Sequence, residues 1–308
     1  WTWLVALALL GFLVGCADVL SDTAPQTLGP AVAGSTDYGA ANGLVQGARS
    51  VGVTLVGPAL GTALLAWSSD AAFGAAALAL LVALAATRAL PRRPPPPRDG
   101  QRGLAAAADG IRTIFRTPAL RGMTLLLTGM IFGWAAWPTL MVSYAVDPAG
   151  LDLGADGLSL IMTALGLGSL GGALAVARLR RWLGERWCLL LDPVGITLFL
   201  AVPALGAGPW LIGLSAFLAG FGAIVWSVVV AAYFQATVPA QRLGRVATAY
   251  RWLGWAVYPA GAGLTGVVAE WLGYRPTFGL FAGWALLVAV SFFWLLPREV
   301  RSPARAAG

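Results

Sequence analysis

Histidine and lysine are both absent from the 308 residues, and only two cysteines, Cys16 and Cys188, are present. Without histidine the chain has no His-based catalytic triad, no zinc site of the HExxH type and no histidine proton relay. Two distant cysteines provide neither a disulfide framework nor a CxxC metal site. The sequence therefore indicates no enzyme, no metal and no cofactor, and the net charge of +7 is carried wholly by arginine.

Charged residues of either sign are also scarce. They make up 11% of the chain, whereas a soluble domain is about a quarter charged. Hydrophobic residues reach 58%, and the mean hydropathy is +0.78. Apolar runs at 1–16, 71–87 and 160–177 approach or reach the ~20 residues that cross a bilayer as a helix. These runs are continuous rather than alternating, so a transmembrane β-barrel is the weaker interpretation and an all-α membrane protein is predicted.

Nine membrane-spanning helices are expected, three before and six after a segment rich in proline and arginine. They fall near residues 3–20, 44–66, 71–89, 119–143, 158–177, 188–205, 209–235, 247–269 and 276–296. Proline disfavours helix and gives an extended, semi-rigid linker. The expected domains are a partial helical bundle (1–90), a linker with an amphipathic helix (91–118) and a six-helix bundle with a tail (119–308).

Arginines occur in every second loop between these spans. The positive-inside rule assigns such loops to the cytoplasm, and the loops between them, at 146–157, 206–209 and 272–276, contain a single arginine. One orientation satisfies this pattern, with the N-terminus outside, the linker and C-terminus in the cytoplasm, and the chain in the inner (plasma) membrane. Because the arginines cluster in short loops rather than along one face, nucleic acid is not an expected partner.

An internal repeat relates the second span to the eighth. Each has an arginine in its cytoplasmic part, Arg49 or Arg251, followed by a proline, Pro58 or Pro259. The offset of about 200 residues is the size of a six-helix half, and parallel repeats of this kind build one large class of transporters. If the second span is the fifth helix of a first half, three helices precede Trp1, and we expect further sequence upstream.

Several stretches resemble the major facilitator superfamily. "ARLRRWLGER" resembles its loop between helices eight and nine, and "ADGIRTIFRTPALRGM" resembles its helix after the linker. "SDTAPQTLGPAV" with "AANGL", and "YFQATVPAQRLGRVATAYRWLGWAVYPAGAGLTG", are similar to its exporter branch, which includes the enterobactin exporter and macrolide efflux proteins. The resemblance implies a two-bundle helical fold in which the chain supplies helices 4 to 12 of twelve.

The resemblance also implies a cytoplasmic loop motif that acts as a gate latch. The residues that match it are Gly172, Arg178, Arg181, Gly184 and Arg186. Ala177 occupies the position where the family usually has an acid, so the sequence departs from the family pattern at this point of the latch. The letters "GLGSLG" at 166–171 match a dinucleotide fingerprint, but they lie inside a span, where small residues favour close helix packing.

Polar and aromatic side chains inside the spans are the candidate site residues, because charges in a membrane are costly and by default functional. Asp18 is the candidate for proton coupling, although a capping role near the helix end is equally compatible with its position. The candidates for a gate or cavity are Arg49, Trp226, Tyr233, Gln235, Tyr250 and Arg251. A structural role is the alternative for the arginines, and packing for the aromatics. Asp192 and Glu270, close to span ends, are interpreted as structural.

The function expected from these observations and the resemblance is secondary active transport. Two bundles would rock about a site at the midplane, exporting a small amphipathic molecule in exchange for protons. The expected partners are the lipid bilayer, that small molecule and protons, and the protein is expected to be a monomer. The alternatives are a degenerate, non-transporting relative and a permease subunit that needs a partner ATPase, although no Walker motif occurs in the chain.

Overall fold

The computed structural model describes residues 68–88, 104–148 and 150–297, together with the isolated positions 52, 60 and 64. All elements in these residues are helices, and no strand occurs among them. The all-α prediction is confirmed for this part of the chain. The predicted span at 3–20 lies outside it, and so does the span at 44–66 apart from the three isolated positions.

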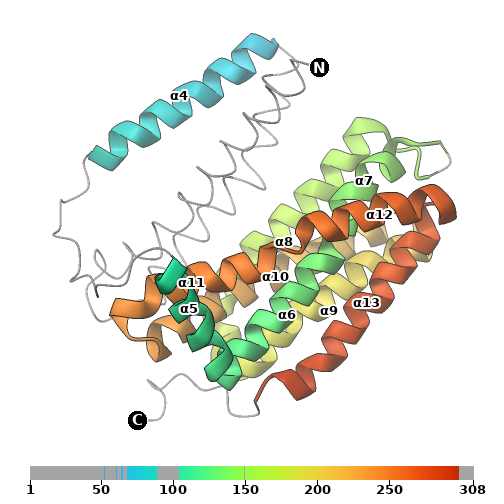
Figure 1. The fold of residues 1–308 in the computed structure, drawn as a ribbon. Helices are drawn as coiled ribbons and strands as arrows, with labels where there is room; N and C mark the ends of the chain where they lie inside the picture. The colour runs from blue at the N-terminus through green and yellow to red at the C-terminus, as the bar shows by residue number, and fades with distance from the viewer. Residues whose placement is uncertain are drawn as a thin grey trace.

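Helix α4 (Ser69–Arg88) corresponds to the span predicted at 71–89. The hydroxyl of Ser68 accepts a hydrogen bond from the Ala71 N–H at 3.1 Å and caps the helix start. Asp70 in the first turn and Arg88 in the last turn complement the helix dipole. Figure 1 shows α4 apart from the other described helices, and its apolar side chains are largely exposed, as in a helix that faces lipid.

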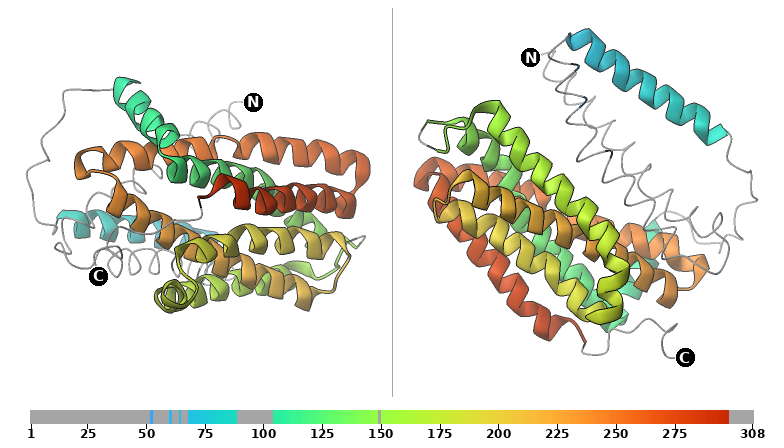
Figure 2. Two further views of the ribbon diagram at one scale, coloured as in Figure 1. Left: turned by 90° about the horizontal axis from the view of Figure 1, so that it is seen from below. Right: turned by 180° about the vertical axis from the view of Figure 1, so that it is seen from behind.

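Helix α5 (Leu104–Arg116) is the amphipathic helix expected within the linker. Its side chain Ile114 is fully buried, whereas Arg112 and Arg116 are exposed. It packs mainly against α11 (Ala240–Trp255) and also contacts α6 (Pro118–Trp134). Figure 2 shows from two further sides how α5 lies at one end of the bundle.

The remaining helices form one bundle, and five of its segments are long and apolar enough to cross a membrane. These segments are α6 with α7 (Ala136–Val146), α8 (Gly154–Trp182), α9 (Glu185–Ala204), α10 (Pro209–Thr237) and α13 (Tyr274–Leu295). They match five of the predicted spans to within a few residues. The sixth predicted span, 247–269, is instead divided between α11 and α12 (Tyr258–Leu272).

Two breaks interrupt the predicted spans, and both lie just before a proline. Helices α6 and α7 meet at Ala135, three residues before Pro138, and α11 and α12 meet at Ala256 and Val257, before Pro259. Proline has no N–H to donate to the preceding turn, and its ring crowds the carbonyl one turn back. The predicted span at 247–269 thus consists of two successive helices, which are divided just before Pro259, and it stays a prediction as a membrane span.

Glycines bring α8 and α10 into close contact. The Cα of Gly168 faces the Phe217 carbonyl, and the Cα of Gly220 faces the Leu165 carbonyl, so neither position has room for a side chain. A Cβ on Gly172 would come within 2.6 Å of the Phe221 carbonyl oxygen. Small residues allow helix backbones to approach in this way in membranes. The "GLGSLG" stretch is thus part of a helix interface.

The connections lie at two opposite ends of the bundle. One end, called here the arginine end, carries Arg112, Arg116, Arg121, Arg178, Arg180, Arg181, Arg186, Arg242 and Arg245. At the other end the Tyr274 hydroxyl donates to Asp147 Oδ2 at 3.0 Å, and Arg275 lies beside Gly206. The alternation of arginine-rich and arginine-poor loops therefore corresponds to two ends of the described bundle.

Candidate functional site

The candidate site is a group of polar side chains inside the apolar bundle, on α9, α10 and α11. Helix α9 begins at Glu185, so Asp192 lies two turns into the helix, about 10 Å along its axis at about 1.5 Å per residue. Its residue is only 5% exposed, and its Oδ1 atom has no hydrogen-bond partner among the described residues. A buried acid without a partner in a membrane helix indicates function by default.

Helix α10 approaches α9 closely at Asp192 because Gly222 has no side chain. A Cβ on Gly222 would lie 2.7 Å from the Leu191 carbonyl oxygen and 2.8 Å from the Asp192 Cα. Gly195, one turn along α9, makes a similar approach to the Leu218 carbonyl. The two backbones therefore enclose Asp192 from the side of α10.

Trp226 lies one turn beyond Gly222 on the same face of α10. Its indole Nε1 donates a hydrogen bond to the Tyr250 hydroxyl on α11 at 2.9 Å, and both side chains are buried. The ring of Phe234 packs edge to face against Tyr250, with centroids 5.0 Å apart. This pair joins α10 to α11 in the interior of the bundle.

The Tyr250 hydroxyl also links the pair to charged groups. The Asp192 carboxyl and the Arg251 guanidinium both lie close enough to act on this hydroxyl electrostatically. Three candidates from the sequence, Trp226, Tyr250 and Arg251, are thus brought together. Asp192, the fourth residue of this polar group, was interpreted from the sequence as a structural residue near a span end. An acid followed by proline inside an apolar run could have indicated a functional residue.

The other candidates on α10 lie nearer the arginine end. Tyr233 is buried, and Gln235 is partly buried with an Oε1 atom that lacks a donor among the described residues. The described hydrogen bonds do not join either side chain to Trp226 or Tyr250. Asp18 and Arg49 lie outside the described residues.

The predicted loop motif is divided among different roles. Gly172 contacts α10, as described above, and Gly184 has a φ of 80° that allows the tight turn between α8 and α9. The guanidinium of Arg178 lies 5.8 Å from the Trp182 ring centroid, and that of Arg186 lies 5.5 Å from the Phe292 ring centroid. Arg181 is exposed.

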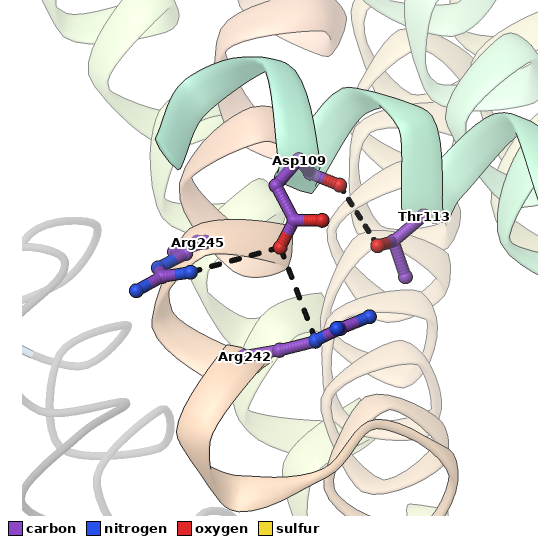
Figure 3. A network of polar contacts seen from close by, with 4 residues as sticks. All are labelled: Asp109, Thr113, Arg242 and Arg245. Atoms are coloured by element: carbon purple, nitrogen blue, oxygen red, sulfur yellow. Dashed lines mark hydrogen bonds and ion pairs between the residues drawn. The ribbon is translucent and has the colours of Figure 1, made fainter. Parts of the chain in front are cut away.

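Two ion-pair groups lie at the arginine end. Arg180 pairs with Glu185 across the α8–α9 turn. Asp109 on α5 lies 3.7 Å from Arg245 and 3.9 Å from Arg242, measured between its Oδ2 and the nearest guanidinium nitrogens (Figure 3). Figure 3 also shows the Thr113 hydroxyl donating to the Asp109 carbonyl, at 2.8 Å. The Asp109 pairs attach the linker helix to the start of α11.

Metal ligation has no candidate in the part of the chain that the structure describes. No group of three Asp, Glu, Cys or His side chains comes together there. The arrangement instead provides a carboxyl, a phenol, an indole and a guanidinium within an apolar bundle. Such groups can exchange protons or bind an amphipathic molecule.

Comparison with known proteins identifies the family. A search of curated proteins found no match. A family model described as the Major Facilitator Superfamily matches residues 1–262, which is most of the chain. Together with five described segments that are able to cross a membrane, this match identifies the chain as a multi-pass membrane transporter belonging to the Major Facilitator Superfamily.

Proposed function

We propose that this transporter is a secondary active exporter, which moves a small amphipathic molecule out of the cell in exchange for protons. Two helix bundles rock about a site near the membrane midplane, so that the site opens to one side at a time. Differential binding of protons and substrate to the two states shifts the balance between them.

The polar group on α9, α10 and α11 is the observation that supports this proposal. Burying an acid in an apolar bundle is costly, so a buried acid such as Asp192 indicates a functional role. Aromatic faces suit the apolar part of a substrate, and the hydroxyl and guanidinium suit its polar part. The sequence resemblance to the exporter branch supports the direction of transport.

The other candidates from the sequence complete the proposal. Asp18 binds and releases a proton during the cycle, while Arg49 and Arg251, at equivalent repeat positions, help to close the cytoplasmic gate. Tyr233 and Gln235 line the route toward that gate. The arginine end faces the cytoplasm of the inner membrane, together with the C-terminus, and the protein works as a monomer.

A transport assay with a panel of compounds tests the proposal. The protein, expressed from its complete reading frame, is placed in everted membrane vesicles energised by a proton gradient. We expect uphill accumulation of at least one amphipathic compound, its loss when an ionophore collapses the gradient, and its loss in Asp18→Asn. Accumulation that persists without a gradient, or that needs ATP hydrolysis, contradicts proton coupling. A panel with no transported compound contradicts the export proposal.

A further inference from the structure

We propose that Asp192 is a second proton-binding site, which holds a proton while α9, α10 and α11 are packed as described and releases it when they separate. This proposal rests on the proposed proton-coupled function. It adds a site in the second bundle, formed by the buried Asp192 carboxyl on α9, whose charge acts on the Tyr250 hydroxyl of the Trp226–Tyr250 pair.

The burial of Asp192 favours its neutral form in this conformation. A charged carboxylate taken out of water is strongly destabilised unless donors or a cation replace its hydration. The Asp192 Oδ1 atom is fully enclosed and has no donor among the described residues. Taking up a proton forms one O–H bond on a carboxylate oxygen and removes the charge, and release to water reverses this step.

A neutral carboxyl needs an acceptor for its new O–H group, and α9 provides one. Pro193 follows Asp192 inside the helix. Because proline lacks an N–H, the carbonyl of Leu189, four residues before Pro193, has lost its usual helical donor. This carbonyl lies one turn before Asp192 on the same helix. The sequence Asp-Pro thus places a protonatable group next to an acceptor with spare capacity.

Few charged groups lie near Asp192 to offset a negative charge. The described titratable or charged side chains on α9 and on the helices of the bundle are Arg121, Tyr144, Arg178, Arg180, Arg181, Glu185, Arg186, Cys188, Tyr233, Arg242, Arg245, Tyr250, Arg251, Tyr258, Glu270, Tyr274 and Arg275. Most of them lie at the helix ends. Glu185 and Arg186 are two turns away from Asp192 along α9, and Arg180 is paired with Glu185. On α11, Tyr250 is the group on which the Asp192 charge acts, and Arg251 is the cation that acts on the same hydroxyl.

The link to Tyr250 explains how the proton at Asp192 would affect the bundle. The Tyr250 oxygen accepts the Trp226 indole N–H, so the phenol keeps its own proton to donate. A negative Asp192 would attract this donor, whereas a neutral Asp192 would not. Loss of the proton therefore favours a rearrangement of α11 relative to α9, and the contact between α10 and α11 changes with it.

Close backbone packing makes proton exchange depend on conformation. Gly222 and Gly195 bring the α10 and α9 backbones together at Asp192 and one turn after it along α9. Water reaches the carboxyl only when these helices part. Such gating allows a bound proton to be carried between two states rather than to leak.

Infrared spectroscopy of the purified protein tests proton binding directly. We expect wild type in detergent at neutral pH to show the C=O band of a protonated carboxyl, and Asp192→Asn to lose it. Glu270→Gln is the matched control, because it removes an exposed carboxyl from α12 and should keep the band. A band unchanged in a correctly folded Asp192→Asn overturns the proposal. If Asp192→Asn does not fold, Asp192→Glu takes its place, and this variant should shift the band rather than leave it unchanged.

Transport measurements then separate a proton-binding role from a structural one. We expect Asp192→Asn to lose uphill, proton-driven export to the level of vesicles without protein, while substrate exchange without a gradient continues. We expect Asp192→Glu to recover part of the uphill export. Full uphill export in Asp192→Asn contradicts the coupling role, even if the infrared band is lost. Failure of wild type to export any compound contradicts the proposed function instead, and it leaves the infrared result as an independent measurement.

Discussion

The indole N–H of Trp226 is buried and has one described acceptor, the hydroxyl of Tyr250 at 2.9 Å. A hydrogen bond in an apolar interior contributes modestly when it is made, but the group left behind is costly when its partner is removed. The pair therefore joins α10 to α11 through a single hydrogen bond. Its loss should be measurable even though the rings continue to pack.

Tyr250→Phe tests this bond. The substitution keeps the ring and its contact with Phe234 but leaves the Trp226 N–H without its acceptor, so we expect a destabilisation of about 1–3 kcal/mol. The thermal midpoint of the purified protein should fall accordingly. Tyr258→Phe is the control, because the Tyr258 ring packs on Trp134 and Trp255 while its hydroxyl is in no described hydrogen bond. Equal shifts for the two variants would show that the Trp226 bond adds nothing.

Trp226 and Tyr250 were candidates from the sequence because each carries a polar group inside a predicted span. It missed Asp192 because the residue lies only four positions into the predicted span at 188–205, near its end. The structure begins α9 at Glu185 and brings Gly222 of α10 against Asp192. That contact joins residues 30 positions apart in the sequence, and no local pattern predicts it.

At the scale of elements, the contact between α5 and α11 depends on packing more than on charge. The Asp109 pairs with Arg242 and Arg245 are 3.9 and 3.7 Å long. These side chains are still in part accessible to water, and ion pairs at a surface are worth about 0–1 kcal/mol. In contrast, a Cβ on Gly110 would lie 2.6 Å from the Arg245 carbonyl oxygen and 3.2 Å from the Ala249 Cβ. The backbone of α5 therefore rests directly on α11.

Gly110→Leu should consequently disturb α5 more than Asp109→Asn does. We expect the leucine to lower the thermal midpoint clearly and to make the linker more sensitive to a protease added at the arginine end. Asp109→Asn should change both only slightly. Ala108→Leu is the matched control, since Ala108 is an exposed position on the same helix. If Ala108→Leu and Gly110→Leu behave alike, the close approach of α5 to α11 is not what holds the linker helix.

The helix positions were predictable from hydropathy, whereas their interruptions were not. Long apolar runs gave five spans of the second bundle to within a few residues, since a bilayer sets the length of a helix that crosses it. The division of the predicted span 247–269 by Pro259 was missed because prolines occur in unbroken membrane helices as well. Pro193 and Pro203 lie inside α9 without ending it.

At the scale of the whole molecule, the arginines define which way the bundle faces the membrane. The sequence predicted that they lie in alternate loops, and the structure places those loops at one end of the described bundle. Since the positive-inside rule acts on such loops, we expect this end to be cytoplasmic.

Cysteine labelling in intact cells tests the orientation. In a background with Cys16 and Cys188 replaced by alanine, Leu205→Cys should react with a membrane-impermeant maleimide added outside. Arg181→Cys should react only after the membrane is opened. Both positions are exposed, at opposite ends of the bundle. A difference in labelling therefore reports the side of the membrane and not the burial of the cysteine. Labelling of Arg181→Cys from outside would show that the arginine end faces outward, which contradicts the proposed orientation and with it the direction of export.

The family and the helical class were predictable from the sequence because composition and loop motifs extend over most of the chain. The proposed coupling site depends on which helices meet in space, and only the structure describes those contacts. Asp18 and Arg49, outside the described residues, stay predictions of the sequence alone. Proton-coupled export therefore depends most on whether substrate and proton movements are linked in the same protein.

Proton and substrate exchange in liposomes measures that link most directly. The purified transporter is reconstituted with a pH-sensitive dye trapped inside, without any imposed gradient, and a compound that it exports is added outside. We predict a pH change inside the liposomes that accompanies substrate entry and saturates with substrate concentration. This change should disappear in Asp192→Asn and remain in Glu270→Gln. Substrate entry without any change in internal pH would contradict proton-coupled export.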